Sequence, residues 1–77
     1  MAKYILKNGD QYVEYARRVW RYSDKTGTLQ RTIDLMISYT NKERKAQVFA
    51  NKDSVEMLIT TAKQIKDIDL YSVQIEI

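Results

Sequence analysis

The sequence predicts an α+β fold, in which a mainly antiparallel sheet carries one amphipathic helix on one face and the elements follow the order ββββαβ. Three observations predict this class. Apolar and polar residues alternate along 29–39 and 71–77, which is the period of half-buried strands. Asn8-Gly9 fits the tight turn of a hairpin. Between the two alternating segments, apolar residues recur at helical spacing over 55–65.

The N-terminal third predicts two paired strands. We expect residues 3–7 to form a strand that turns at Asn8-Gly9 into a second strand beginning near Asp10. Residues 11–22 also fit a helix, because they contain no breaker and Asp10 could cap it. The strand interpretation is favoured, because the turn at 24–27 and the long strand after it need a neighbour of similar length.

The length of the loop at this turn sets the register of the long hairpin. A three-residue loop over 25–27 places Asp24 opposite Thr28. On one face it sets Arg18 across from Asp34, which is a favourable charge pair. On the other face it pairs apolar residues that would form the core: Val13 with Tyr39, Tyr15 with Ile37, and Val19 with Ile33.

The remaining residues predict a short strand, a helix and a final strand. Residues 46–50 form the short fourth strand. Asp53 caps the helix, and Glu56 stands three residues further on, in the capping-box position. Residues 71–77 form the last strand, and its odd-numbered residues face the helix. The helix stripe that covers the sheet consists of Val55, Leu58, Ile59, Ala62 and Ile65.

Composition excludes several kinds of chemistry. A chain of 77 residues is expected to form one domain, residues 1–77. It contains no cysteine and no histidine, which excludes disulfides, zinc–cysteine sites, thiol nucleophiles and imidazole catalysis. No nucleophile is spaced beside a base and no glycine-rich loop is present, so we expect no enzyme, cofactor or metal. Residues 1–7 carry no signal-peptide pattern and no run of about 18 apolar residues occurs, so we expect a cytoplasmic protein.

Charge is unevenly distributed along the chain. Residues 1–52 hold eleven Lys/Arg and five Asp/Glu, a net charge of +6, whereas residues 53–77 carry a net charge of −3. Such a division can attract a polyanion to the basic part. It can equally draw the basic face of one copy to the acidic face of another.

The sheet face without the helix is expected to be bare, because no further element is predicted to cover it. In the expected register, the even-numbered residues of the second strand point to this face, and they include the only tryptophan, Trp20. Three interpretations of these aromatic residues stay open. In the first, the aromatic side chains pack on the chain's own Arg and Met side chains. In the second they contact a second copy or another protein, and in the third they stack on the bases of single-stranded nucleic acid.

We therefore expect a small non-catalytic module that binds protein through this face and the hairpin 11–40, with a homodimer among the options. The alternative is a small basic nucleic-acid-binding protein. Small size, a cysteine-free chain and the lack of an active site are similar to small accessory proteins of phages and mobile elements, many of which bind host or defence proteins. The expected protein-binding residues are Tyr12, Arg18, Trp20, Tyr22 and Met36. The alternative nucleic-acid-binding residues are Arg17, Arg18, Trp20, Arg21, Tyr22 and Lys25.

Overall fold

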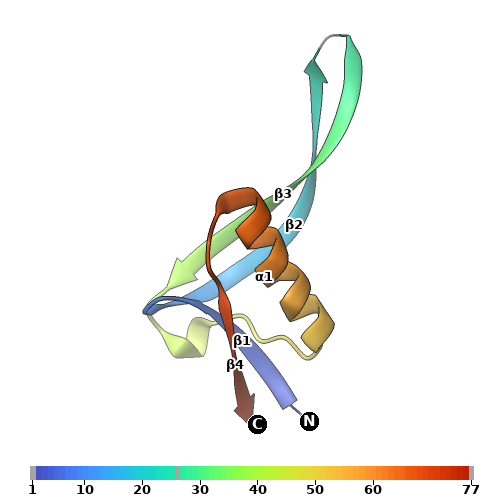
Figure 1. Ribbon diagram of the computed structural model, residues 1–77. Helices are drawn as coiled ribbons and strands as arrows, with labels where there is room; N and C mark the ends of the chain where they lie inside the picture. The colour runs from blue at the N-terminus through green and yellow to red at the C-terminus, as the bar shows by residue number, and fades with distance from the viewer. Residues whose placement is uncertain (1, 26, 77) are drawn as a thin grey trace.

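A computed structural model describes residues 2–25 and 27–76 and confirms the α+β class. One four-stranded antiparallel sheet has the strand order β3-β2-β1-β4, and one helix lies against it (Figure 1). Within the described part of the chain, no helix is long and apolar enough to cross a membrane. The elements are β1 (Ala2–Asn8), β2 (Gln11–Lys25), β3 (Thr28–Thr40), the 3-10 helix η1 (Glu43–Lys45), α1 (Lys52–Lys66) and β4 (Tyr71–Glu76).

Residues 11–25 form a strand and not a helix, as the paired-strand interpretation requires. The turn before it contains Gly9 at φ +60°, a left-handed conformation that glycine adopts without strain. Its partner β3 is 13 residues long, so the two strands make a long antiparallel ribbon. The two strands pair with each other from Tyr12 and Thr40 to Lys25 and Thr28, with one irregularity between Val13 and Tyr15, so the ribbon extends beyond the rest of the sheet.

The core lies between one face of the sheet and α1. Its three largest fully buried side chains, Leu6, Val13 and Val55, come from β1, β2 and α1. Burying each of them is worth roughly 1.5–3 kcal/mol. These three pack in one cluster with other buried residues from β2, β3, α1 and the segment before β4: Ala16, Leu35, Leu58, Ala62 and Leu70.

Helix α1 begins before the position that the sequence predicted. Its N-cap is Asn51, whose side-chain Oδ1 accepts a hydrogen bond of 2.8 Å from the backbone N–H of Asp53. Asp53 is therefore inside the first turn, where its negative charge still favours the positive end of the helix dipole. The expectation that Asp53 is the cap was wrong, because Asn51 already has the extended backbone and the short polar side chain that capping requires.

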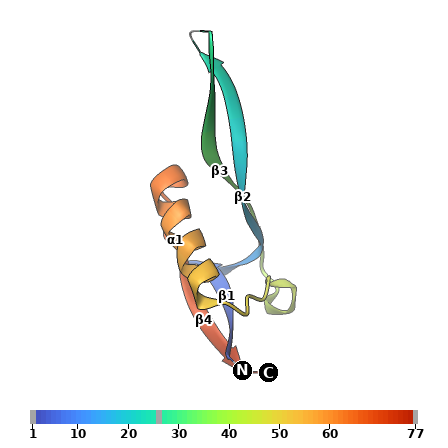
Figure 2. The ribbon, with the colours of Figure 1, turned by 90° about the vertical axis from the view of Figure 1, so that its right-hand side faces the viewer.

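The segment between β3 and α1 forms η1 and one isolated β-bridge instead of a fourth strand. At this bridge the N–H of Tyr4 donates to the carbonyl oxygen of Phe49, and the N–H of Phe49 donates back, both at 2.8 Å. β1 and β2 pair directly at only two positions, so the segment fills the space where they separate. Figure 2 shows η1 on the opposite side of the strands from α1. The sheet face without the helix is therefore partly covered at this end, contrary to expectation.

Gln47 fixes this segment to β2. Its backbone N–H donates to the carbonyl oxygen of Val13 at 2.9 Å, and its side-chain Oε1 accepts from the backbone N–H of Ala16, also at 2.9 Å. These two groups flank Glu14, where β2 carries a bulge. Gln47 thus satisfies backbone groups of β2 beside the bulge.

The bulge at Glu14 changes the register of the long hairpin. Val13 pairs with Tyr39 as expected, but Tyr15 pairs with Ser38, and every later pair is displaced by one residue. In an unbulged register the large side chain of Tyr15 would take the core position that follows Val13 on this face of β2. The bulge brings the small side chain of Ala16 into the core instead and leaves Tyr15 exposed.

Several expected pairs are therefore wrong. In each of these pairs, the partner on β2 is the residue one position after the expected one. The β3 residues concerned are Ile37, Ile33, Asp34 and Thr28. Lys25 pairs with Thr28, which also rules out the three-residue loop; Thr26 lies outside the described residues. The observed pairs are Ala16 with Ile37, Trp20 with Ile33, Val19 with Asp34, and Lys25 with Thr28.

β4 also differs from expectation in the face that its odd-numbered residues occupy. Ser72 of β4 lies opposite Leu6, and Val73 lies opposite Ile5. Leu6 belongs to the core beneath α1, so its neighbour Ile5 points to the other side of β1. Val73 lies on the face away from the helix, because residues directly opposite each other share a face.

Candidate functional site

The outer part of the β2–β3 ribbon stands clear of the rest of the molecule (Figure 1). The C-terminal end of α1 reaches the ribbon where Lys66 Nζ lies 3.6 Å from Asp34 Oδ1. We call the described residues beyond this contact, 20–25 and 27–33, the arm. The described chain measures 50 × 24 × 17 Å, an elongation that the arm produces.

One face of the arm carries four exposed apolar side chains, which we call the arm patch. Their exposed fractions are 53% for Trp20, 64% for Tyr22, 68% for Leu29 and 38% for Ile33. Trp20 lies directly opposite Ile33, and Ile33 shares its face with Leu35 of the core. The arm patch therefore continues the core-facing side of the ribbon past the end of α1.

Two arginines border the arm patch. The Arg31 guanidinium carbon lies 4.1 Å from the centroid of the Trp20 ring, a cation–π contact that stacks the two side chains. Arg18 lies at the base of the arm and lines a hollow of about 140 Å³ together with Val19, Trp20 and Ile33. The surface therefore combines aromatic rings, aliphatic groups and planar cations.

The structure divides the five expected protein-binding residues between two faces. Tyr12 is next to the buried Val13 and Met36 is next to the buried Leu35, so both point away from the helix, as expected. Arg18, Trp20 and Tyr22 lie opposite Leu35, Ile33 and Arg31, on the core-facing side of the ribbon. Their expected place on the helix-free face was wrong, because the bulge at Glu14 turns over the following part of β2.

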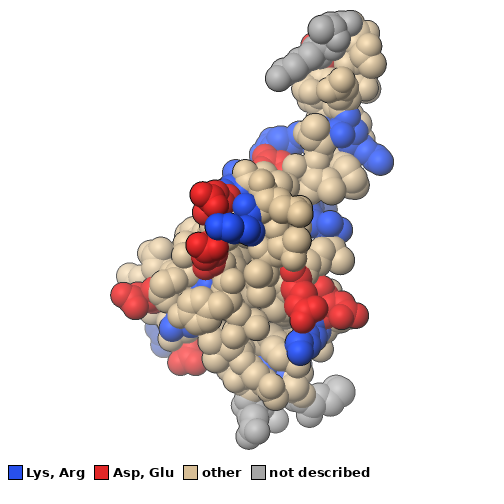
Figure 3. All heavy atoms as spheres, in the orientation of Figure 1, with Lys and Arg blue, Asp and Glu red and all other residues tan. Residues whose placement is uncertain are grey.

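The basic residues of the ribbon are also divided. Arg17 and Arg21 alternate with Arg18 and Trp20 along β2, so they point to the opposite face. The side chain of Lys25 lies outside the described residues. In Figure 3 the arm shows separate basic side chains among uncharged atoms. The residues expected to stack bases and to contact phosphates therefore do not share one face.

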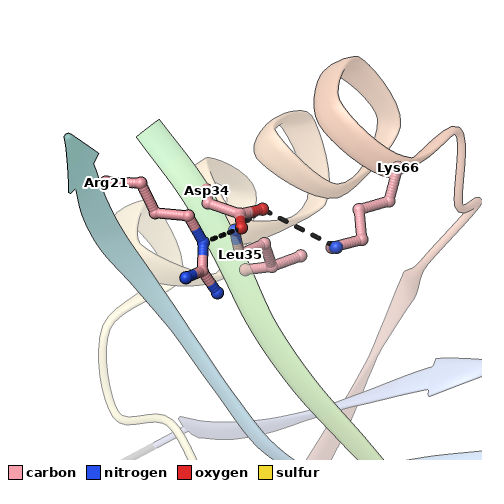
Figure 4. Close-up of polar contacts among 4 residues, drawn as sticks. All are labelled: Arg21, Asp34, Leu35 and Lys66. Atoms are coloured by element: carbon pink, nitrogen blue, oxygen red, sulfur yellow. Dashed lines mark hydrogen bonds and ion pairs between the residues drawn. The ribbon is translucent and has the colours of Figure 1, made fainter. Parts of the chain in front are cut away.

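Arg21 is engaged within the chain. Its guanidinium Nε donates to Oδ2 of Asp34, and Lys66 approaches the same carboxylate from the end of α1 (Figure 4). The hydrogen bond from Arg21, with a second from the backbone N–H of Leu35, lowers the pKa of Asp34 below its ordinary value. Asp34 thus joins both strands of the ribbon to the helix at the base of the arm.

The charges at the end of α1 are similarly paired with one another. Lys63 Nζ lies 2.9 Å from Asp67 Oδ1 and 3.1 Å from Asp69 Oδ1. Hydrogen bonds to these two carboxylates raise the pKa of Lys63. Surface pairs of this kind contribute little to stability, but they reduce the free charge at this end of the molecule.

The helix-free face of the sheet carries a different aromatic group. Lys7 Nζ lies 4.8 Å from the ring centroid of Tyr12 and 5.9 Å from that of Tyr71. The Tyr71 hydroxyl donates to the carbonyl oxygen of Gly9 at 2.9 Å. These residues satisfy one another, so Tyr12 is part of an internal contact and less available to a partner than the arm patch.

Sequence reasoning missed Leu29, Arg31 and Ile33 as part of the surface. All three were assigned to the core side of the third strand, where a helix was expected to cover them. They were missed because the sequence carries no clear local signal for the bulge at Glu14, which moves Trp20 and Tyr22 to the same face as these three residues. Comparison with protein-family models, curated proteins and solved structures finds no match for this chain.

Proposed function

We propose that the protein is a non-catalytic binding module that contacts another protein through the arm patch. The observation that carries the proposal is the exposure of Trp20, Tyr22, Leu29 and Ile33 together on one face of a projecting ribbon. Tryptophan, tyrosine and arginine are the residues that contribute most to protein-binding hot spots. The arm patch presents two of these types, and Arg18 and Arg31 supply the third at its border.

The size of the arm patch fits a protein contact of moderate strength. Its four side chains expose roughly 400 Å², if a whole aromatic side chain presents about 150–250 Å². At about 25 cal/mol per Å², covering this surface yields about 10 kcal/mol. That gain is comparable to the cost of association, which is about 4–15 kcal/mol. A partner that buries only this patch is therefore expected to bind weakly, and a tight complex needs additional surface.

The nucleic-acid alternative has less support in the geometry. A single-stranded site needs aromatic rings and cations along one groove. Here Arg17 and Arg21 lie on the face opposite Trp20, and Arg21 already pairs with Asp34. Arg31 covers one side of the Trp20 ring, where a base would stack. A cytoplasmic location stays a prediction from the cysteine-free composition.

The test is affinity capture with matched variants. The immobilised chain is exposed to nuclease-treated extract of the cells that produce it, and retained proteins are identified, purified and titrated against the chain. Tyr22→Ser/Leu29→Ser removes the two most exposed residues of the patch, with little effect expected on folding. Val48→Ser/Met57→Ser is the control, because it removes exposed apolar side chains outside the arm.

We expect at least one protein to bind the wild type and the control variant with equal affinity. The same protein should bind the Tyr22→Ser/Leu29→Ser variant with at least tenfold lower affinity. The proposal is overturned if no protein binds the wild type, or if both variants bind alike. Binding that is seen in a parallel untreated extract, disappears after nuclease treatment and weakens steeply with salt supports the nucleic-acid alternative instead.

A further inference from the structure

We propose that a second copy of this chain pairs with the outer edge of β3 in the arm, forming a symmetric dimer with a continuous sheet. The inference rests on the proposed function, because it enlarges the same arm patch. β3 is at one edge of the sheet, so its outer backbone groups pair with no strand among the described residues. Every residue from Thr28 to Ile33 is exposed. Such an edge is a template for another strand.

The residues of this edge resemble those of a paired strand more than those of a protected edge. Natural edges are commonly guarded by lysine, proline or a bulge. Residues 28–36 contain no lysine or proline, and the bulge of the hairpin lies in β2. Threonine, leucine and isoleucine dominate the segment, and its only charged residues are Arg31 and Asp34.

The sequence of β3 also selects one symmetric register. A two-fold axis perpendicular to the sheet leaves each face of one copy continuous with the same face of the other copy. The residue at the axis pairs with its own copy, and residues at equal distances before and after it pair with each other, so odd-numbered residues pair with odd-numbered ones and even-numbered with even-numbered ones. A centre at Arg31 sets two like charges opposite each other. A centre at Ile33 sets Gln30 against the apolar side chain of Met36 and leaves Asp34 without an amide partner. A centre at Thr32 separates the two Arg31 side chains and brings Gln30 opposite Asp34.

The register centred on Thr32 is self-complementary. Thr32 pairs with its own copy, and threonine pairs are favourable across strands. Gln30 lies opposite Asp34 of the second copy, where its amide can donate to a carboxylate that has further acceptor capacity. On the other face, Leu29 lies opposite Leu35 and Arg31 lies opposite Ile33, so no two like charges meet.

This arrangement doubles the surface that the proposed function requires. Because the two-fold axis preserves the faces, the arm patches of both copies lie on the same side of the joined sheet. Together they present roughly 800 Å² of surface. A standard protein interface buries about 800 Å² on each partner. The dimer therefore supplies the additional area that one arm lacks.

The absence of cysteine allows a direct test by cross-linking. In the proposed register the two Thr32 Cα atoms are about 4.5–5.5 Å apart, within the range that a disulfide spans. Gln30 lies on the same face, but its two copies are about 14 Å apart, since they are four residues out of register. We expect Thr32→Cys to form a disulfide-linked dimer at least tenfold faster than Gln30→Cys in the same redox buffer. Equal rates, or faster linking through Gln30→Cys, overturn the inference.

Mass measurements by light scattering on the cysteine-free chain complete the test. The wild type is expected to rise from the 9.1 kDa of one chain towards twice that mass as concentration increases. Thr32→Lys and Thr32→Glu should each remain monomeric, because like charges then meet at the axis, and a mixture of the two should recover the dimer mass. Recovery in the mixture shows that both variants are folded.

A wild type that keeps the mass of one chain at every concentration overturns the dimer, as does a Thr32→Lys variant that dimerises normally. This outcome is distinct from failure of the proposed function, which is decided by whether the Tyr22→Ser single variant, which leaves every residue of β3 unchanged, still binds the captured protein.

Discussion

The contact between Gln47 and the bulged part of β2 allows a quantitative test of the fold. Gln47→Ala removes the Oε1 atom that lies 2.9 Å from the backbone nitrogen of Ala16. Ala16 is buried, so its amide loses this partner with little access to water. An unsatisfied buried amide costs about 1–3 kcal/mol, and we expect the free energy of unfolding to fall by an amount in that range. A chain of this length has roughly 4–12 kcal/mol of total stability.

Urea unfolding measures this loss, and thermal unfolding gives an independent value. For a domain of this size, 1 kcal/mol corresponds to about 4–8 °C in Tm. Gln64→Ala is the matched control, since Gln64 is exposed on α1 and its replacement should change stability by less than about 0.5 kcal/mol. The Ala16 amide should also exchange its hydrogen faster in Gln47→Ala. An unchanged stability, or an equal loss in Gln64→Ala, would refute the role assigned to Gln47.

Three further predictions concern single side chains. Asn51→Ala should lower the free energy of unfolding by about 1 kcal/mol in urea titrations, because it removes the N-cap of α1, whereas Asn51→Ser should nearly preserve it. Tyr39→Phe should raise the free energy of unfolding by up to about 1 kcal/mol, because the buried Tyr39 hydroxyl has no hydrogen-bond partner among the described residues. A clear decrease in the free energy of unfolding would contradict this. Arg21 lowers the pKa of Asp34 in the folded chain below its value in the unfolded chain. The contact between Asp34 and Arg21 therefore stabilises the fold above about pH 4, and this contribution is lost as the pH falls through the lowered pKa. NMR titration of the Asp34 carboxyl should show this low pKa, and Arg21→Ala should raise it.

The elements that follow from local periodicity and turn residues were predictable. The alternation in 29–39 gave β3, Asn8-Gly9 gave the first turn, and the spacing of Val55, Leu58 and Ala62 gave the buried stripe of α1. These signals are local, so they do not depend on how the rest of the chain packs. The short strand predicted over 46–50 was wrong, because Phe49 makes a single bridge in the space between β1 and β2.

The candidate site was predicted only in part, because its geometry depends on a non-local feature. Trp20 and Tyr22 were expected to be exposed, and the structure exposes both. Their face depends on the register of the whole hairpin, which the bulge at Glu14 shifts by one residue. A bulge has no strong sequence signal of its own, so the shift could not be deduced from the alternation of β2 and β3 alone. The end of α1 at Lys66 then determines which part of this face stays uncovered.

The claim that the arm patch is a protein-contact surface is tested most directly by Trp20 fluorescence during titration with a protein that the chain binds. Trp20 is the only tryptophan, so in a complex with a tryptophan-free fragment of that protein the emission reports the arm alone. We expect the emission to shift to shorter wavelength and to become less accessible to a soluble quencher as the complex forms. A complex that forms while both properties of Trp20 stay unchanged would contradict the account.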